Sequence, residues 1–421
     1  MSSLFKSALS RRTFMRNLGV ASVAAASVPA FAAVTGAVAR QQSRGPSGED
    51  GPEPGWTSDE IVQVSTNENP LGPAPAALEA VAAMAAVSNR YHGDVVQSTV
   101  STAIDLFGLR RGYAGLFPGS AGALNLALAS HIGPDRPLVH GDPSYEQAAR
   151  VADSVGAPKI AVKLTASYAH DVRAMVAASP KAGAYFIVNP NNPTGTMTPK
   201  ADIVWLLKNK PAGSVVVVDE AYHDFTSEDS CIDLVAADQD IIVTRTFSKI
   251  YGMAGLRAGL AFARPEYFQR FRQAAPYAPA LASVSIASAA AANAALQDKD
   301  LVPLRRKINA DNREATLEFL TRHGYTVLPG SQTNFFMVDV KRPGGEFQQA
   351  MLDENVMIGR TWTALPTYVR VTVGTRDEMA RFQAAFVKCM NQPPAPANGA
   401  SLQYHPALNP SELGRGEFSF A

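Results

Sequence analysis

The sequence predicts an α/β protein with a mostly parallel sheet sandwiched by helices, followed by a smaller α+β domain. From about residue 61 to 275, helical stretches alternate with short runs that are apolar throughout. Such runs are typical of strands buried on both faces of a parallel sheet. Polar residues that could carry chemistry, Asn192, Asp219 and Lys249, lie just past three of these runs. Ligands of open α/β sheets bind beyond the carboxyl ends of the strands, so these positions favour a functional site there.

The apolar runs define the expected strands of the larger sheet. They are residues 137–140, 160–162, 184–188, 215–218, 241–244 and 259–262. After about residue 275 an Ala-rich helix, 281–296, leads into the smaller domain, with strands at 325–327, 334–340 and 368–373 and helices at 346–355 and 376–388. We therefore expect a large domain over 76–275 and a small domain over 276–391. Residues 392–421 are rich in Pro, Asn, Gly and Ser and are expected to be a flexible tail.

Composition excludes some functions. The chain has 421 residues, 46% of them hydrophobic, and a formal net charge of +1. Four of its positive charges, Lys6, Arg11, Arg12 and Arg16, precede residue 40, where there are no acidic residues. The rest is slightly acidic, so it has no field to hold nucleic acid. The two cysteines, at positions 231 and 389, are expected to be ordinary thiols, and no spacing of Cys or His predicts a metal site.

The N-terminal 39 residues have the pattern of an export signal. Residues 10–16 read SRRTFMR, and an uncharged, Ala-rich run follows over 18–39, with small-x-small cleavage candidates at 30–32 and 37–39. This resembles a twin-arginine signal, which implies export of the folded protein to the periplasm or another extracytoplasmic space. The alternative is a retained N-terminal membrane anchor. Residues 40–75 are expected to be a linker and then an arm that covers the substrate.

Lys249 is the most informative residue. It follows an apolar run and is surrounded by hydroxyls, small residues and a nearby arginine. A lysine that reacts reversibly with an aldehyde cofactor must be partly desolvated, and cations must hold the cofactor's phosphate. Asp219 ends the valine run 215–218, where a buried carboxylate is costly without a partner. A cationic ring nitrogen would be such a partner, and helix capping is the alternative role.

Three segments, 189–195, 215–222 and 246–257, occur in an order and spacing that resemble the fold type I pyridoxal-phosphate (PLP) dependent aminotransferases. The resemblance is strongest to their histidinol-phosphate aminotransferase-like branch and extends from about residue 64 to 390. It implies that Lys249 forms a Schiff base with the cofactor and moves the substrate proton, and that Asp219 pairs with the pyridine nitrogen. Asn192 and Tyr222 match residues that bind the cofactor's phenolic oxygen. A cis peptide bond is expected before Pro193.

The same resemblance assigns further cofactor contacts. Ser120 and Ala121 open a helical run whose free N–H groups would bind the phosphate. The remaining matches are Thr246, Ser248 and Arg257 at the phosphate, Tyr145 stacked on the ring, and Tyr91 reaching the phosphate of a neighbouring subunit. The match of Tyr91 implies a homodimer with shared active sites.

Substrate contacts are expected from three residues. Arg370 would recognise a carboxylate or phosphate through its planar guanidinium. Arg360 matches a second anion-binding arginine used by members with phosphorylated substrates, but the short apolar segment between the two arginines leaves its direction open. Asn69 belongs to the segment 67–73, which resembles the family's substrate-covering arm.

The sequence thus predicts a PLP-dependent aminotransferase that transfers an amino group from an amino acid or amine to a 2-oxo acid by a ping-pong mechanism. Histidinol phosphate is one candidate donor, but an export signal argues against a cytosolic biosynthetic role and favours another amino acid or amine, with aromatic ones among the candidates. Two alternatives stay open. One is a PLP-dependent decarboxylase or lyase on the same fold, and the other is a non-catalytic binding protein of the cell envelope.

Overall fold

The computed structural model describes residues 61–274 and 284–393. Its largest sheet has seven strands in the order β2-β8-β7-β6-β5-β3-β4. Strands β3 to β7 pair in parallel, whereas β8 is antiparallel to both of its neighbours. The strands are β2 (Ala114–Phe117), β3 (Leu138–Asp142), β4 (Lys159–Lys163), β5 (Ala184–Val188), β6 (Val215–Asp219), β7 (Ile241–Thr246) and β8 (Gly259–Phe262).

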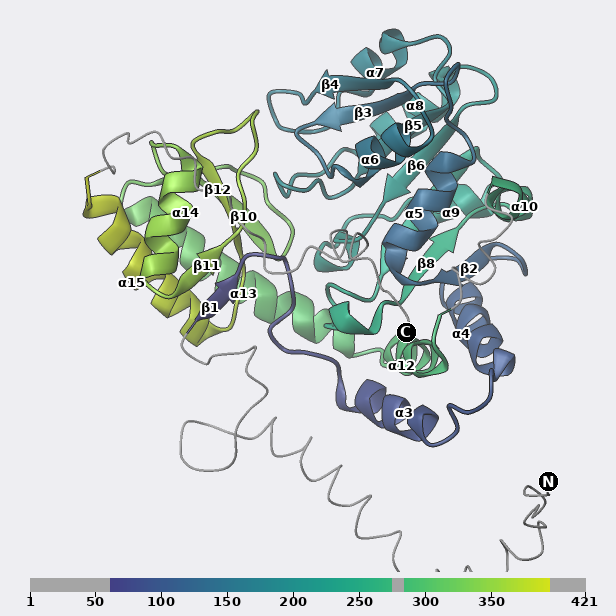
Figure 1. Ribbon diagram of the computed structural model, residues 1–421, viewed down its shortest axis with the longest axis horizontal. Coiled ribbons are helices and arrows are strands. Elements are labelled where there is room, and N and C mark those ends of the chain that lie inside the picture. The colour runs from purple at the N-terminus through teal and green to yellow at the C-terminus, as the bar shows by residue number, and fades with distance from the viewer. Residues whose placement is uncertain (1–60, 275–283, 394–421) are drawn as a thin grey trace, which may run out of the picture. The chain divides into compact units, whose positions relative to one another are not determined.

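Helices pack along this sheet in Figure 1, with α5 contacting β2 and β6 to β8, and α7 contacting β3 and β4. The helices of this part are α3 (Pro75–Ala85), α4 (Gly93–Leu106), α5 (Gly119–Ala129), α6 (Gln147–Ser154), α7 (Val172–Ala178), α8 (Lys200–Asn209), α9 (Ile232–Ala236), α10 (Pro265–Ala274) and α12 (Ile286–Gln297), with short 3-10 turns η1 (His223–Phe225) and η2 (Ala254–Leu256). Helix α12 packs against α3 and α4, which brings together segments about 200 residues apart.

The C-terminal part forms a separate group of elements in Figure 1. Strands β12 (Tyr368–Thr372), β10 (Phe335–Asp339) and β9 (Thr326–Val327) make an antiparallel sheet, and β1 (Val62–Val64) pairs in parallel with β11 (Val356–Ile358). The helices are α13 (Leu301–Arg322), α14 (Gly344–Asp353) and α15 (Arg376–Asn391). Helix α15 begins with a capping box between Thr375 and Glu378, which satisfies the first free N–H groups.

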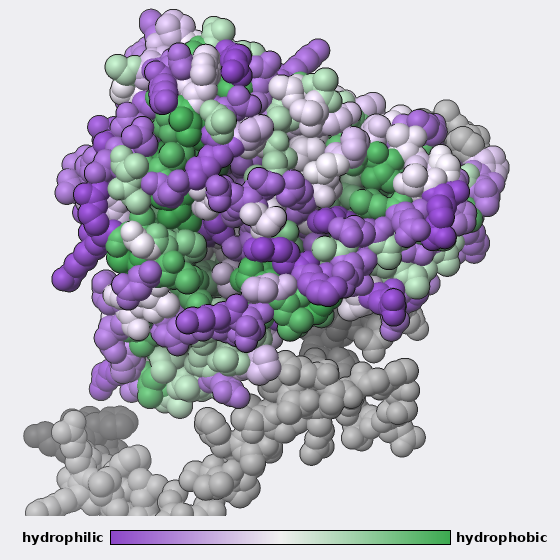
Figure 2. Space-filling view, turned by 180° about the vertical axis from the view of Figure 1, so that it is seen from behind, coloured by the Kyte–Doolittle hydropathy of each residue, from purple (hydrophilic) through white to green (hydrophobic). Residues whose placement is uncertain are grey.

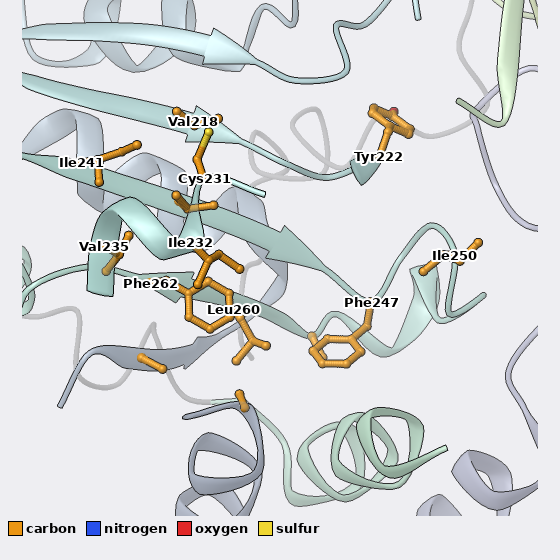
Figure 3. Close-up of a cluster of buried hydrophobic side chains, with 14 of the residues drawn as sticks. Val218, Tyr222, Cys231, Ile232, Val235, Ile241, Phe247, Ile250, Leu260 and Phe262 are labelled. Carbon is orange, nitrogen blue, oxygen red and sulfur yellow. The ribbon is translucent and has the colours of Figure 1, made fainter. Parts of the chain in front are cut away.

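The buried core supports the carboxyl ends of the central strands. Alternate valines of β6 point to opposite faces of the sheet, so Val216 and Val218 join one buried cluster and Val215 and Val217 another. Figure 3 shows part of the first cluster, in which Phe247 and Ile250 belong to the segment that follows β7. Burying large side chains on both faces holds β6 and β7 rigidly. The polar residues that directly follow these strands are therefore held in fixed positions as well.

Most of the sequence-based architecture is confirmed. All six strands expected in the large sheet are present, and the sheet is mostly parallel. Strand β4 was expected to be buried on both faces, and this is wrong: it is an edge strand with alternating exposed and half-buried residues. Strands β1, β2 and β11 and helix α13 were not predicted. The 275/276 domain boundary and the expected start of the Ala-rich helix lie outside the described residues, so the domain division stays a prediction.

The predicted signal at 1–39, most of the predicted linker and nearly all of the predicted tail also lie outside the described residues. Within the described ranges, no helix is both long and apolar enough to cross a membrane. In those ranges there is also no group of three or more His, Cys, Asp or Glu placed to hold a metal ion.

Candidate active site

The chemistry-bearing residues converge at one edge of the sheet. Strands β5, β6 and β7 are adjacent and parallel, so the segments that follow them leave the sheet at the same edge. These segments carry Asn192, Asp219 and Lys249. The peptide bond between Asn192 and Pro193 is cis, as expected from the sequence. The sheet topology alone therefore brings together three predicted site residues from 58 positions of sequence, 192–249.

Asp219 is the buried acid of the site. Its side chain is 3% exposed, and its Oδ1 accepts a hydrogen bond from Thr244 Oγ1 at 2.9 Å. Burial raises the pKa of Asp219 to about 6, although the hydrogen bonds from Thr244 and the backbone of Ala221 oppose that rise. Both donors are neutral groups, so a cation at this carboxylate would be strongly stabilised.

A buried ion-pair network fixes the turn that follows Asp219. Glu220 is fully buried and accepts hydrogen bonds from Arg245 Nε at 2.8 Å and from the backbone N–H of Cys231 at 2.7 Å. Arg245 also pairs with Asp224. Because removing one partner of such a pair leaves an uncompensated buried charge, the network resists rearrangement. It holds the segment 219–224, which includes Tyr222, and sequence reasoning missed it because only the charges themselves are visible there.

Lys249 lies half-buried among backbone oxygens. Its Nζ donates hydrogen bonds to the carbonyl oxygens of Asn67 (2.9 Å) and Thr66 (3.2 Å) and lies 5.6 Å from the ring centre of Tyr222. Burial lowers the pKa of Lys249 to about 8, with Arg370 as the next largest cause. About a tenth of this amine is therefore unprotonated at pH 7, far more than for an ordinary lysine, as a nucleophilic amine requires.

The side chain of Tyr222 lies beside Lys249. It is buried, and its hydroxyl accepts a hydrogen bond from Asn67 Nδ2 at 2.9 Å. Burial raises its pKa to about 12, so the hydroxyl stays protonated at neutral pH and can donate a hydrogen bond. Asn67 has a left-handed backbone conformation (φ 57°), which asparagine tolerates. Sequence reasoning missed Asn67, although it lies in the segment that was identified as the arm.

A phosphate cradle lies between the start of α5 and the segment after β7. Gly119 has φ +74°, and a Cβ placed on it would lie 2.5 Å from Arg257 Nη2. The positive φ and the close approach of the Arg257 guanidinium both favour glycine at the start of this helix. Arg257 Nη1 also donates to Ser248 Oγ at 3.3 Å, and Ser248 bonds Thr246. Exposed N–H groups, two hydroxyls and a guanidinium in one place suit a phosphate dianion.

The other predicted cofactor contacts are placed as follows. Ser120 and Ala121 lie in the first turn of α5 and are half-buried. Tyr145 is half-buried just before α6, and burial raises its pKa, with the Asp219 charge as the next cause. Tyr91 does not join the cluster: its side chain is 98% exposed. Its predicted contact with a neighbouring subunit stays a prediction.

Arg370 connects the smaller sheet to the site. It is 7% exposed, and it donates hydrogen bonds of 2.8 Å to Asn192 Oδ1 and to the carbonyl oxygen of Ser65. Its guanidinium lies over the rings of Phe335 and Trp362. These contacts hold the planar group in a fixed direction beside Asn192, which suits bidentate recognition of a carboxylate.

The remaining predicted substrate residues are engaged elsewhere in the chain. Arg360 pairs with Glu146, a residue that sequence reasoning missed. Asn69 donates to the carbonyl oxygen of Ile250 at 3.0 Å and accepts from the backbone N–H of Leu71. It lines a cavity of about 310 Å³ together with Ser248. A larger cavity of about 690 Å³, between α13 and α15, is lined by none of the predicted cofactor residues.

Comparison with known proteins identifies the family of the chain. The chain matches the aminotransferase class I and II family over residues 59–386. A histidinol-phosphate aminotransferase 1 from Cupriavidus pinatubonensis is 35% identical over 344 residues, which cover 78% of this chain and 88% of that relative. A histidinol-phosphate aminotransferase from Symbiobacterium thermophilum is 33% identical and covers 79% of this chain and 91% of its own length. The crystal structure of a histidinol-phosphate aminotransferase from Sinorhizobium meliloti, in complex with pyridoxal-5'-phosphate, superposes with a TM-score of 0.71 at 22% identity over 91% of this chain and 98% of that one.

The fold and the site define a fold type I transferase with a lysine at the carboxyl edge of its sheet. The chain belongs to the aminotransferase class I and II family, and it is a PLP-dependent aminotransferase. Its residues fit the cofactor. The buried Asp219 carboxylate would meet the ring nitrogen, and the cradle that a Cβ at Gly119 would fill would hold the phosphate. The decarboxylase or lyase and the non-catalytic binding protein are not favoured.

Proposed function

We propose that the protein transfers the amino group of an α-amino acid whose carboxylate is bound by Arg370, with Lys249 as the residue that holds the cofactor and moves the substrate proton. The observation that carries the proposal is the convergence of Lys249, Asp219, Tyr222 and Asn192 at one sheet edge, with Arg370 bonded to Asn192. PLP supplies an electron-accepting ring that delocalises the charge left when the α-proton is removed.

The protein's own groups have defined tasks in this proposal. Arg370 and Asn192 would orient the donor by its carboxylate, so that the α-proton faces Lys249. With a pKa lowered to about 8, the Lys249 amine can both accept and return a proton near neutral pH. Tyr222 would donate a hydrogen bond into the site because its hydroxyl stays protonated. The backbone oxygens of Ser65 and Asn67 accept hydrogen bonds from Arg370 and Lys249, so this segment would help to cover the bound donor.

The donor remains the open part of the function. The curated relatives named above are histidinol-phosphate aminotransferases, so histidinol phosphate is one candidate. The predicted export signal supports a different donor, because histidine biosynthesis is cytosolic. An amino acid with an aromatic side chain fits a site in which the Tyr222 ring lies near Lys249 and the Phe335 ring lies near Arg370.

We further propose that the enzyme is a homodimer with shared active sites. Figure 2 shows hydrophobic residues reaching the surface among polar ones on the face turned away from Figure 1. The large exposed hydrophobic residues of the described chain include Leu71, Val87, Tyr91 and Leu106. Tyr91 comes from the segment between α3 and α4, where a partner subunit could receive it. Sedimentation of the purified enzyme tests the dimer, and Tyr91→Ala tests the shared site through cofactor affinity.

Export is part of the proposal as well. The run SRRTFMR at 10–16 and the Ala-rich stretch at 18–39 support transport by the twin-arginine route. A folded PLP enzyme can carry its cofactor through that route, whereas an unfolded chain would not hold it. Fusing residues 1–45 to a reporter tests this: the reporter should reach the periplasm, and Arg11→Lys together with Arg12→Lys should keep it in the cytoplasm.

The function itself is tested by donor screening. Purified holoenzyme would be incubated with single amino acids and with histidinol phosphate, and mass spectrometry would detect the carbonyl product of each. An aromatic or other neutral amino acid should give its 2-oxo acid, and Arg370→Lys should raise KM for that donor more than it lowers kcat. Release of CO₂ or of an eliminated group in place of the 2-oxo acid would exclude transamination.

A further inference from the structure

Arg360 and Glu146 form an ion pair at the rim of the site. Arg360 follows β11, and Glu146 directly follows Tyr145. Nη1 of Arg360 lies 2.9 Å from Glu146 Oε1 and 2.8 Å from Oε2, so one guanidinium N–H group engages the whole carboxylate. The guanidinium also lies over the ring of Trp362, at 4.7 Å from its centre. Charge pairing and the cation–π contact together hold this arginine in one direction.

The ion pair adjoins the residues that bind substrate. The backbone N–H of Gly359 donates to the carbonyl oxygen of Arg370 at 2.8 Å. The Trp362 ring lies near both guanidinium groups, with that of Arg370 at 5.2 Å and that of Arg360 at 4.7 Å from its centre. Glu146, the acidic partner of the pair, directly follows Tyr145 in the chain. A substrate with its carboxylate at Arg370 would therefore meet the pair with the far end of its side chain.

The pairing with Glu146 changes the charge that Arg360 offers to a substrate. A guanidinium engaged by a carboxylate presents little net positive charge, and an incoming phosphate dianion would meet the negative charge of Glu146 as well. Glu146 has a second arginine nearby, Arg150, whose Nη2 lies 3.8 Å from Oε2. Both partners of the main pair are partly exposed, at 41% for Arg360 and 40% for Glu146. They are thus reachable by a substrate, and their charges act on it through partly screened contacts.

We propose that Glu146 is a specificity-determining residue: by occupying Arg360 it discriminates against donors with a phosphate or carboxylate at the far end and selects amino acids whose side chain carries no negative charge. The inference rests on the proposed function, in which Arg370 takes the α-carboxylate. It names the class of donor that the site accepts. Glutamate, whose second carboxylate lies at the far end of its side chain, is then a poor donor compared with phenylalanine.

The test compares holoenzyme variants by the ratio of kcat/KM for glutamate, which carries a carboxylate at the far end, to that for phenylalanine, which does not. Glu146→Gln keeps the shape of the side chain but releases Arg360, so the ratio should rise about tenfold, mainly through KM for glutamate. Glu146→Ala is a second variant with the same expected direction. Asp153→Asn removes the same charge from the same helix, at an exposed pair with Lys159, and should leave the ratio unchanged.

Inhibition by phosphate and a double variant show whether the released Arg360 guanidinium causes the change in specificity. Inorganic phosphate should inhibit the Glu146→Gln enzyme more strongly than the wild type, and adding Arg360→Gln should abolish that gain, because the gain comes from the released guanidinium. An unchanged ratio in both Glu146 variants, or a wild-type enzyme that already prefers glutamate to phenylalanine, would overturn the inference while leaving transamination intact. Absence of a carbonyl product from every donor would instead refute the proposed function itself.

Discussion

Replacing Asp219 by asparagine should stabilise the cofactor-free protein and weaken cofactor binding at the same time. Burial raises the pKa of this carboxyl from its ordinary value of 3.8 to about 6. That difference corresponds to about 3 kcal/mol, which is the penalty for ionising the buried carboxylate at a pH well above 6. The folded protein holds the extra proton, so its stability falls as pH rises from 3.8 through 6. Asparagine removes the charge and can still accept the hydrogen bond from Thr244.

The assay is urea unfolding of cofactor-free protein at pH 5 and pH 8. At pH 8 the Asp219→Asn variant should exceed the wild type in free energy of unfolding by up to about 3 kcal/mol, and the gain should shrink at pH 5. PLP should raise the urea midpoint of the wild type more than that of the variant. The matched control is Asp105→Asn, which removes an exposed carboxylate from α4. A variant that is less stable than the wild type at pH 8, or a difference that does not depend on pH, would refute the reasoning.

Three further results are expected. Gly119→Ala should weaken cofactor binding at least about tenfold in equilibrium titrations with PLP, because its Cβ would lie 2.5 Å from Arg257 Nη2. The control Gly122→Ala should bind PLP normally, because its Cβ would meet nothing closer than 3.4 Å. The rate at which cofactor-free protein captures PLP should rise with pH and level off above about 9, because the pKa of Lys249 is lowered from 10.5 to about 8 and the neutral amine is the reactive form; a rate still climbing beyond pH 10 would contradict this. Sodium borohydride should fix PLP to the peptide that contains Lys249, and Lys249→Ala should lose that adduct while it keeps the circular dichroism spectrum of the wild type.

Local pattern and topology explain what the sequence could predict. Continuous apolar runs identified the buried strands β5, β6 and β7 because each is covered on both faces. Once those strands are parallel neighbours, the residues just past their ends must meet, which placed Asn192, Asp219 and Lys249 together. The same reasoning wrongly predicted that β4 is buried on both faces, because the apolar run of Ile160 to Val162 lies at the sheet edge and is only half-buried.

Contacts between distant segments could not be predicted. Glu146 and Arg360 are 214 positions apart, and their pairing depends on how the segment after β11 packs against the start of α6. Asn67 was missed for the same reason: its contacts with Lys249 and Tyr222 cross more than 150 positions. Charge and amide side chains of this kind occur throughout the surface, so nothing local distinguishes those that reach the site. The contact of Tyr91 depends on a second subunit, which one chain cannot supply.

The most direct test of the central claim is a single-turnover experiment with purified holoenzyme and excess phenylalanine, in the absence of any 2-oxo acid. Quenched samples would be analysed by mass spectrometry for phenylpyruvate and for CO₂. The account predicts one phenylpyruvate per active site, no CO₂, and further product only after a 2-oxo acid is added, as a ping-pong aminotransferase requires. CO₂ release, or continued turnover without an acceptor, would contradict it.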